Sequence, residues 1–226
     1  MKFKHFLLTK FNVQLGKDGR AYTSGSWLDH RLALFEKYCY PSVQAQACKN
    51  FEWLVFFHPD TAEKYVERIN SLDGLVPIYC AFKKEEIKKA VQSRLGEAEY
   101  IITSRLDNDD AIARRYIGSV QGCFSEREER EFINFTNGCQ LHSDCAHTYG
   151  HEANPFISLI EKAKGFHTVW CKPHGQLHTV GEIRQVETPH PMWMIVIHEH
   201  NLSNRIAAWA DKRLPDLDLN ITFGVA

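Results

Sequence analysis

The sequence predicts an α/β fold, with a mostly parallel central sheet flanked by helices and a less regular C-terminal portion. In the first half, short apolar segments alternate with longer segments in which apolar residues recur every three or four positions. That alternation is typical of parallel strands joined by covering helices. Apolar residues make up 44% of the 226 positions, which is enough for a sizeable core.

Four strand-like segments occupy the first half, and each is followed by a helix-like segment. The second of these strands is continuously apolar, as expected when helices cover both of its faces. In the first helix, Leu28, Leu32 and Phe35 lie on one face. Ser26 is its expected N-cap, and Pro41 should end or kink it. The expected strands are 5–13, 51–57, 75–80 and 99–105, and the expected helices are 23–46, 60–71, 83–95 and 109–120.

The second half shows weaker patterns. The segment 154–165 predicts a helix, with Asn154 as N-cap, Pro155 at the first helical position and Gly165 beyond the end. The residues 130–138 alternate between apolar and polar, which predicts a half-exposed strand. Further strands are expected at 167–171 and 192–197, and a closing helix at 201–214.

Charge and cysteine content exclude several classes of protein. The formal net charge of −1 provides no global field for nucleic acid or an anionic membrane. The seven cysteines are odd in number, irregularly spaced and without a CxxC pair, so we expect reduced thiols. No apolar run approaches the ~20 residues of a membrane helix, and the N-terminus has no signal-peptide pattern. We therefore expect a soluble, cytoplasmic protein, which leaves peripheral membrane contact open.

A cluster of acidic residues follows the fourth expected strand. Asp107, Asn108, Asp109 and Asp110 lie at its carboxyl end, where open α/β sheets bind ligands. If the backbone stays extended, Asp107 and Asp109 point to the same side and repel each other unless a cation lies between them. Mg²⁺ or Mn²⁺ with a substrate diphosphate would satisfy such a pair. Alternatively, Asp109 and Asp110 cap the next helix, and Asp107 and Asn108 form a turn.

The segment SRLDNDDAI resembles the aspartate motif of GT-A fold glycosyltransferases that use nucleotide sugars. More narrowly, the chain resembles a bacterial family of putative rhamnosyltransferases. The matching landmarks follow one another along nearly the whole chain, which makes the resemblance much more specific than the acidic triplet alone. They are HFLLTKFNV, WLDHRLALFEKYCYPSVQAQ, NFEWLVFF, TSRLDNDDAI, NPFISLIEK and IHEHNLSN.

The resemblance implies one GT-A domain with a Rossmann-like half. Residues 1–112 would form the nucleotide-sugar-binding half and residues 113–226 the acceptor-binding half. The implied reaction is a metal-dependent transfer of a sugar, with rhamnose as the candidate, from a nucleoside diphosphate sugar. The acceptor would be a glycan, a lipid-linked molecule or another hydroxyl compound, as in polysaccharide biosynthesis.

The same resemblance assigns the metal site. Asp107 and Asp109 would be the metal-binding carboxylates, with Mn²⁺ or Mg²⁺ as the ion. Many relatives add a late histidine, and strand alternation places His198 and His200 on one face. We favour His198, because the apolar run ends on it.

Other positions are implied at the donor and at the acceptor. Asp60 would contact the base and ribose, although relatives often carry consecutive acids where this chain has HPD. Arg31 would lie near the diphosphate, and Arg105 could pair with the acids or with phosphate. If the enzyme inverts, Asp110 or Glu152 would remove the proton of the acceptor hydroxyl. The full donor set is Thr9, Phe11, Asn12, Arg31, Asp60, Arg105, Asp107 and Asn108.

Several alternatives remain open. Acids at a strand end also serve metal-dependent phosphohydrolases and nucleotidyltransferases, and a non-catalytic carbohydrate- or nucleotide-binding module would use them as helix caps. His174 and His178 lie in a polar segment that either forms a hairpin or contributes to the acceptor side. A structural zinc site is conceivable at one cluster, although its spacing matches no known finger and a surface loop is favoured. That cluster is Cys139, His142, Cys145, His147 and His151.

Overall fold

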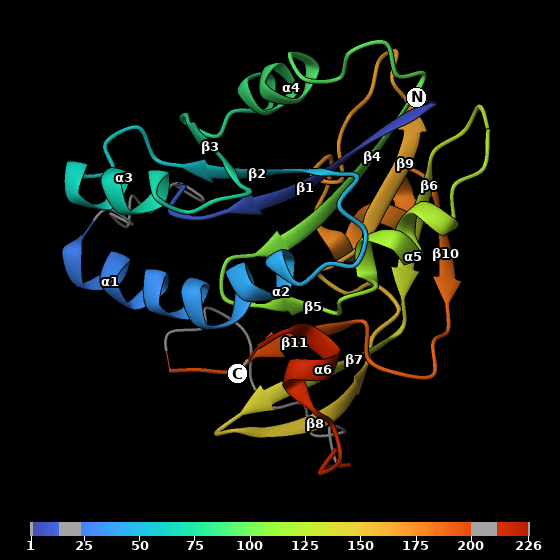
Figure 1. Ribbon diagram of the computed structural model, residues 1–226. Coiled ribbons are helices and arrows are strands. Elements are labelled where there is room, and N and C mark those ends of the chain that lie inside the picture. The colour runs from blue at the N-terminus through green and yellow to red at the C-terminus, as the bar shows by residue number, and fades with distance from the viewer. Residues whose placement is uncertain (1, 14–23, 200–211, 226) are drawn as a thin grey trace.

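The computed structural model describes residues 2–13, 24–199 and 212–225. A seven-stranded sheet forms its centre (Figure 1). The strands are, in spatial order, β10 (Glu182–Val186), β6 (Glu131–Phe135), β9 (Ser158–Lys162), β4 (Tyr100–Asp107), β1 (Phe3–Lys10), β2 (Glu52–Phe57) and β3 (Val76–Tyr79). β1 pairs in parallel with β2 and β4, and β2 with β3, so the βα series predicted for the first half is confirmed.

Helices and loops cover both faces of this sheet. Side chains alternate along β1, so that Leu7 and Phe11 join one core cluster while Phe6 and Leu8 join the other. In Figure 1, α1 and α2 run along the first face and α4 lies across the second. The helices are α1 (Gly25–Leu34), α2 (Tyr40–Gln44), α3 (Glu63–Asn70), α4 (Lys84–Gln92), α5 (Tyr116–Gly122) and α6 (Leu219–Phe223), with a 3₁₀ turn η2 (His174–Thr179).

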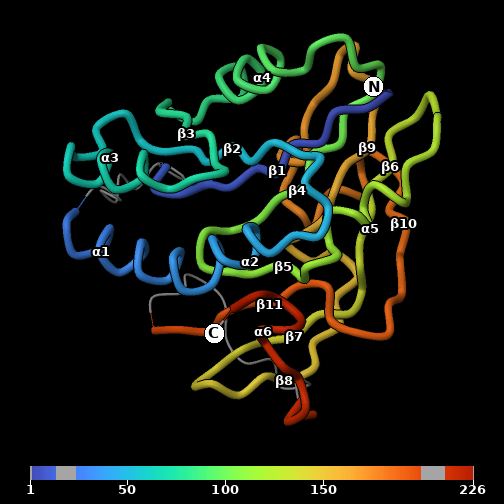
Figure 2. The backbone as a smooth tube through the Cα atoms, in the orientation of Figure 1, coloured from blue at the N-terminus to red at the C-terminus, as the bar shows by residue number. Residues whose placement is uncertain are grey.

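A second, four-stranded sheet extends the first core cluster. Its order is β5 (Ala111–Ile112), β11 (Trp193–Val196), β7 (Asn137–His142) and β8 (Cys145–Gly150), and it lies below α2 in Figures 1 and 2. The Trp193 ring lies directly over Gly138 and donates from Nε1 to Phe135 O at 2.7 Å. The apolar side chains of both sheets therefore share one continuous core.

The helix expected at 154–165 is wrong, because β9 occupies its centre. β9 pairs antiparallel with β4 and β6, and its apolar residues are buried between covered faces. The Asn154 side chain accepts from Phe156 N at 2.9 Å and donates to Phe135 O at 2.8 Å. It thus makes a local turn of the kind that competes with helix N-capping. Gly165 has φ of +77° in the turn that follows β9.

Four further expectations need correction. The helix expected at 109–120 begins only at Tyr116, because β5 forms first and pairs with β11. Of the two outcomes expected at Pro41, the end of the helix is wrong, because Pro41 lies within α2; the helix is instead interrupted just before it by a π-helical segment, η1 (Phe35–Cys39). The expected N-cap moves from Ser26 to Ser24. β6 is fully buried rather than half-exposed, because both faces of the sheet are covered there.

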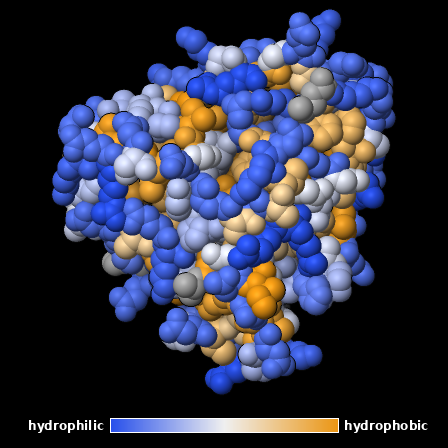
Figure 3. Space-filling model, in the orientation of Figure 1, coloured by the Kyte–Doolittle hydropathy of each residue, from blue (hydrophilic) through white to orange (hydrophobic). Residues whose placement is uncertain are grey.

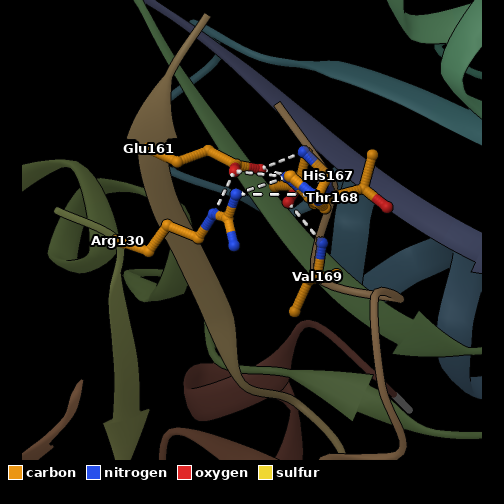
Figure 4. Close-up of polar contacts among 6 residues, drawn as sticks. Arg130, Glu161, His167, Thr168 and Val169 are labelled. Carbon is orange, nitrogen blue, oxygen red and sulfur yellow. Dashed lines mark hydrogen bonds and ion pairs between the residues drawn. The ribbon is translucent and has the colours of Figure 1, made fainter. Parts of the chain in front are cut away.

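The segment expected as a strand at 167–171 is instead a turn held by one buried carboxylate. Glu161, on β9, accepts from the backbone N–H groups of His167 and Thr168 at 2.8 and 2.9 Å (Figure 4). Its second oxygen accepts from Arg130 Nε at 3.1 Å. Val169 N donates to Thr103 Oγ1 on β4. These bonds fix the path that leads from β9 to η2.

The surface seen in Figure 3 is mainly polar, and the cysteines are unpaired as expected. The apolar groups on the face in Figure 3 form small separate areas. Within the described residues, no helix combines the length and apolar character that a membrane crossing requires. All seven cysteines are free. Most of the closing helix expected at 201–214 lies outside the described residues.

Candidate active site

The carboxyl ends of β1 and β2 are joined by Asn12. This buried side chain donates from Nδ2 to Thr61 Oγ1 at 3.0 Å and accepts at Oδ1 from His58 N at 3.0 Å. Asp60 lies in the same loop with 84% of its side chain exposed, and His58 is 3.8 Å from its carboxylate. His58 and Thr61 were not singled out from the sequence, because only the fold brings them to Asn12.

Two residues expected at the nucleotide pocket have their side chains in the core. Thr9 is fully buried and accepts from Trp53 Nε1 at 3.0 Å. Phe11 packs against Phe35 and Phe57, with ring centroids 5.3 and 4.9 Å apart. These two buried side chains support the carboxyl end of β1 from within the core. Their expected contact with the nucleotide sugar stays a prediction.

A buried network links the aspartate motif to α1 and to the end of β11. Asn108 donates to Phe11 O at 2.9 Å and accepts from Arg31 Nη1 at 3.3 Å. Asp109 Oδ2 receives both Arg31 Nη1 at 2.5 Å and His198 Nε2 at 2.9 Å. The structure therefore brings Arg31, Asn108, Asp109 and His198 together, whereas His200 lies outside the described residues.

The protonation of Asp109 follows from these neighbours. Burial alone would raise the pKa of the Asp109 carboxyl, but the hydrogen bond from His198 and the charge of Arg31 outweigh burial and lower the pKa. The guanidinium of Arg31 also lies over the Trp27 ring, 5.3 Å from its centroid. The network thus holds an ionised carboxylate away from water.

Asp110 has a different environment. It is 2% exposed and accepts from Val196 N at 3.0 Å, which ties the motif to β11. Burial, followed by the charges of Asp109 and Asp107, raises its pKa well above the usual range. Neither Asp109 nor Asp110 caps α5, which begins at Tyr116, so the helix-capping alternative is wrong.

Asp107 points to other partners than Asp109 does. β4 ends at Asp107, and Asp110 N donates to Asp107 O at 3.3 Å, so a turn interrupts the extended backbone assumed from the sequence. The Asp107 carboxylate lies 3.8 Å from Arg105 Nη2. Lys10 is its register partner on β1. Burial lowers the pKa of Lys10; Asp107 opposes this effect and Arg105 adds to it.

Two histidines of the second half lie near each other, with ring centroids 6.3 Å apart, and His174 lies near Arg105 and Asp107. His151 Nδ1 accepts from Ala153 N at 2.9 Å, and His174 Nδ1 donates to Ala153 O at 2.5 Å. Burial lowers the pKa of both imidazoles, and the charges of Arg105 and Asp107 also act on His174. Glu152, the residue after His151, is exposed. Its backbone oxygen accepts a hydrogen bond from Gln185 Nε2.

The side chains at the aspartate motif carry the kinds of ligand atom that divalent cations bind. Asp107 and Asp109 offer carboxylate oxygens, which Mn²⁺ and Mg²⁺ prefer, and His198 offers an imidazole nitrogen. Among the described residues, however, no three His, Cys, Asp or Glu side chains are gathered into a cluster that could hold a metal ion. An ion at Asp109 would compete with Arg31 for the same oxygen, Oδ2.

The same finding bears on the zinc alternative at Cys139, His142, Cys145, His147 and His151. The first four of these residues belong to the β7–β8 hairpin rather than to a loop, and His151 directly follows β8. Ser143 and Asp144 form the turn of this hairpin with φ of +47° and +62°, the sign that a two-residue hairpin turn requires. Cys139 points into the core. No metal-binding group of three is present here within the described residues.

Comparisons with known proteins agree with this architecture. Residues 13–209 match the profile of a family described as putative rhamnosyl transferase. Residues 1–349 of S. aureus TarS, solved in complex with UDP-GlcNAc, match with a TM-score of 0.51 and 12% identity over 89% of this chain and 60% of that one. This chain therefore spans less than two thirds of the TarS fragment. The likeness shows that the fold is the expected GT-A type.

A second solved structure is described as a putative nucleotide-diphospho-sugar transferase from Desulfovibrio desulfuricans G20. It matches with a TM-score of 0.43 and 10% identity, over 86% of this chain and 81% of that one. No curated protein sequence matches the chain significantly.

Proposed function

The chain belongs to the putative rhamnosyl transferase family, and from that membership we propose that it transfers a sugar from a nucleoside diphosphate sugar to a hydroxyl acceptor. The observation that carries this proposal is the buried Arg31–Asp109–His198 network at the carboxyl ends of β1 and β4. Open α/β sheets bind ligands at this edge. Buried ion pairs are weak sources of stability, so a charged network here favours a functional role.

On the donor side, we place the diphosphate near Arg31. Its planar guanidinium matches phosphate geometry, and its Nε is buried without a hydrogen-bond partner in the described part of the chain. The loops after β1 and β2, joined by Asn12, would receive the nucleoside, with Asp60 exposed beside them. The UDP-GlcNAc in the TarS structure supports a nucleotide sugar as donor, and the family description suggests rhamnose as the sugar.

We further propose that Mn²⁺ or Mg²⁺ binds at Asp109 and His198, and that Asp107 joins them by turning its carboxylate away from Arg105. The ion would neutralise the charge that builds up on the leaving diphosphate. The hydrogen bond from His198 and the charge of Arg31 lower the pKa of Asp109, so its carboxylate needs no deprotonation, and an ion that binds at Oδ2 would displace Arg31 from it.

For the acceptor, we propose a glycan or a lipid-linked hydroxyl compound, used in the cytoplasm for polysaccharide synthesis. Proton removal from that hydroxyl requires a base that the acceptor can reach. Glu152 is exposed, whereas Asp110 is buried behind β11, so Glu152 is the better placed of the two expected bases.

A thermal-shift panel would test the donor and the metal together. UDP, GDP, dTDP and their sugars would be screened with and without Mn²⁺, using the wild type, Asp109→Asn and the control Asp216→Asn, whose side chain is exposed. We expect one nucleotide class to raise Tm, with a Mn²⁺-dependent increment that only Asp109→Asn loses. The same increment in Asp109→Asn would refute the metal assignment.

The rival functions make different predictions in a product assay. Sugar transfer with release of a nucleoside diphosphate supports the transferase, whereas release of phosphate or of a nucleoside monophosphate without transfer supports a phosphohydrolase or nucleotidyltransferase. If the protein binds a nucleotide sugar equally well with and without metal and forms no product, a binding module would be favoured.

A further inference from the structure

Arg105 is a buried cation that the described residues satisfy poorly. Its side chain is 8% exposed, and its Nε is buried without a hydrogen-bond partner. The nearest carboxylate oxygen, Asp107 Oδ1, lies 3.8 Å from Nη2, which is beyond hydrogen-bond range. A buried charge of this kind is costly unless an opposite charge and hydrogen bonds compensate it.

Lys10 adds a second positive charge on the same face. In the parallel register, Leu8 lies opposite Arg105 and Lys10 lies opposite Asp107. All of these side chains therefore point toward the face covered by α4 and residues 166–180, where Leu8 packs. Two cations share one carboxylate here, and that carboxylate is itself 35% exposed. The group thus carries a net positive charge.

Residues of the second half form the neighbouring wall. The Trp170 ring centroid lies 6.0 Å from Lys10 Nζ. His174 lies close enough for the charges of Arg105 and Asp107 to act on it. Among the described residues, Asp107 is the only carboxylate within 4.0 Å of Arg105.

We propose that Lys10 and Arg105 form a subsite for an anionic group, a phosphate or carboxylate, carried by the acceptor. The proposal rests on the transferase function proposed above, and it replaces the donor role that the resemblance implies for Arg105. The face of the seven-stranded sheet on which Arg105 lies favours the sugar acceptor over the sugar donor. Arg31 and Asp109 meet on the α1 side of the sheet, whereas Arg105 points to the opposite side, beside residues 151–174.

Inorganic phosphate is the probe for this subsite. Tm would be measured against phosphate concentration, with chloride at matched ionic strength, for wild type, Arg105→Gln and Lys10→Gln. Arg184→Gln and Lys89→Gln are matched controls, because both side chains are exposed. Charged hydrogen bonds set the expected loss at about 10- to 100-fold in phosphate affinity for Arg105→Gln, with Lys10→Gln also weakened and both controls unchanged.

Repeating the titration with a saturating nucleoside diphosphate separates the two sources of phosphate chemistry. Under the proposal, the phosphate shift persists and adds to the nucleotide shift. Loss of the phosphate shift would place phosphate in the donor diphosphate site and overturn the proposal. A wild-type shift no larger than that with chloride would also overturn it, as would full binding in Arg105→Gln. If Arg105→Gln does not fold, Lys10→Gln decides.

The failure of this proposal differs from failure of the transferase function. A nucleotide shift without a phosphate shift would refute the subsite and leave the function standing. A phosphate shift that Arg105→Gln loses, in a protein that no nucleotide stabilises, would retain the anion site and refute the function on which its acceptor assignment rests.

Discussion

Acid should destabilise the protein through His5, which lies in β1 at 1% exposure. Gln121 Nε2 can only donate, so at 3.2 Å it assigns the acceptor role to His5 Nδ1. The proton of the neutral ring then lies on Nε2, which is 2.9 Å from Ser104 Oγ. Protonation would turn Nδ1 into a second donor facing Gln121. Burial lowers the pKa of His5 to about 3, from 6.5.

The sign and size of the effect follow from linkage. Because the folded state disfavours the charged ring, the contribution of His5 is fully present above the unfolded pKa and is lost as pH falls toward the folded pKa. With the pKa values of 6.5 and about 3, the loss is about 2 kcal/mol at pH 5 and about 4 kcal/mol at pH 3.

Urea unfolding followed by tryptophan fluorescence would measure this loss. The free energy of unfolding would be compared between wild type and His5→Gln at pH 7.5, 6 and 5, so that the titration of carboxylates common to both proteins cancels. We expect the difference to change by about 2 kcal/mol across this range. His178→Gln, at an exposed position on η2, should show no such change. A pH-independent difference for His5→Gln would refute the reasoning.

Substitutions at three other positions test the Gly138–Trp193 contact, the hydrogen bonds of Glu161 and the N-cap of α6 by urea unfolding. Gly138→Ala should cost about 3 kcal/mol or more, because a Cβ would enter the Trp193 ring; a loss below 1 kcal/mol would contradict that contact. Glu161→Gln should cost about 2 kcal/mol, since an amide nitrogen would replace one of the two carboxylate oxygens and cannot accept the hydrogen bond that this oxygen receives. Asp218→Ala should cost about 1 kcal/mol by removing the bond from Ile221 N that caps α6, whereas Asp218→Asn should retain most of it.

The first half of the fold could be predicted because local and tertiary signals agree there. The apolar run at β2 and the helical periodicity of α1 each specify the element that forms. β9 could not be predicted in this way. Asn154 and Gly165 carry the residue types of helix ends but serve turns on either side of a buried strand. Only the pairing of β9 with β4 and β6 decides between the two outcomes.

The sequence indicated several residues of the candidate site but not how they pair. The sequence placed Asp109 and His198 at strand ends, and the fold joins them. It did not indicate that Arg31 would already neutralise Asp109, nor that Asp107 would face Lys10 instead. Such pairings depend on which helix covers which face, and residue spacing along one strand carries no information on that.

The position of β9 between β4 and β6 has a consequence for synthesis of the chain. β1 to β4 can pair among themselves once residue 107 has been made, but the free edge of β4 finds its partner only when residues 158–162 follow. β6 is made earlier and must also wait for β9 before it joins the sheet. An emerging chain therefore exposes an unpaired apolar strand edge across about 50 residues of elongation, an interval in which chaperone binding or aggregation competes with folding.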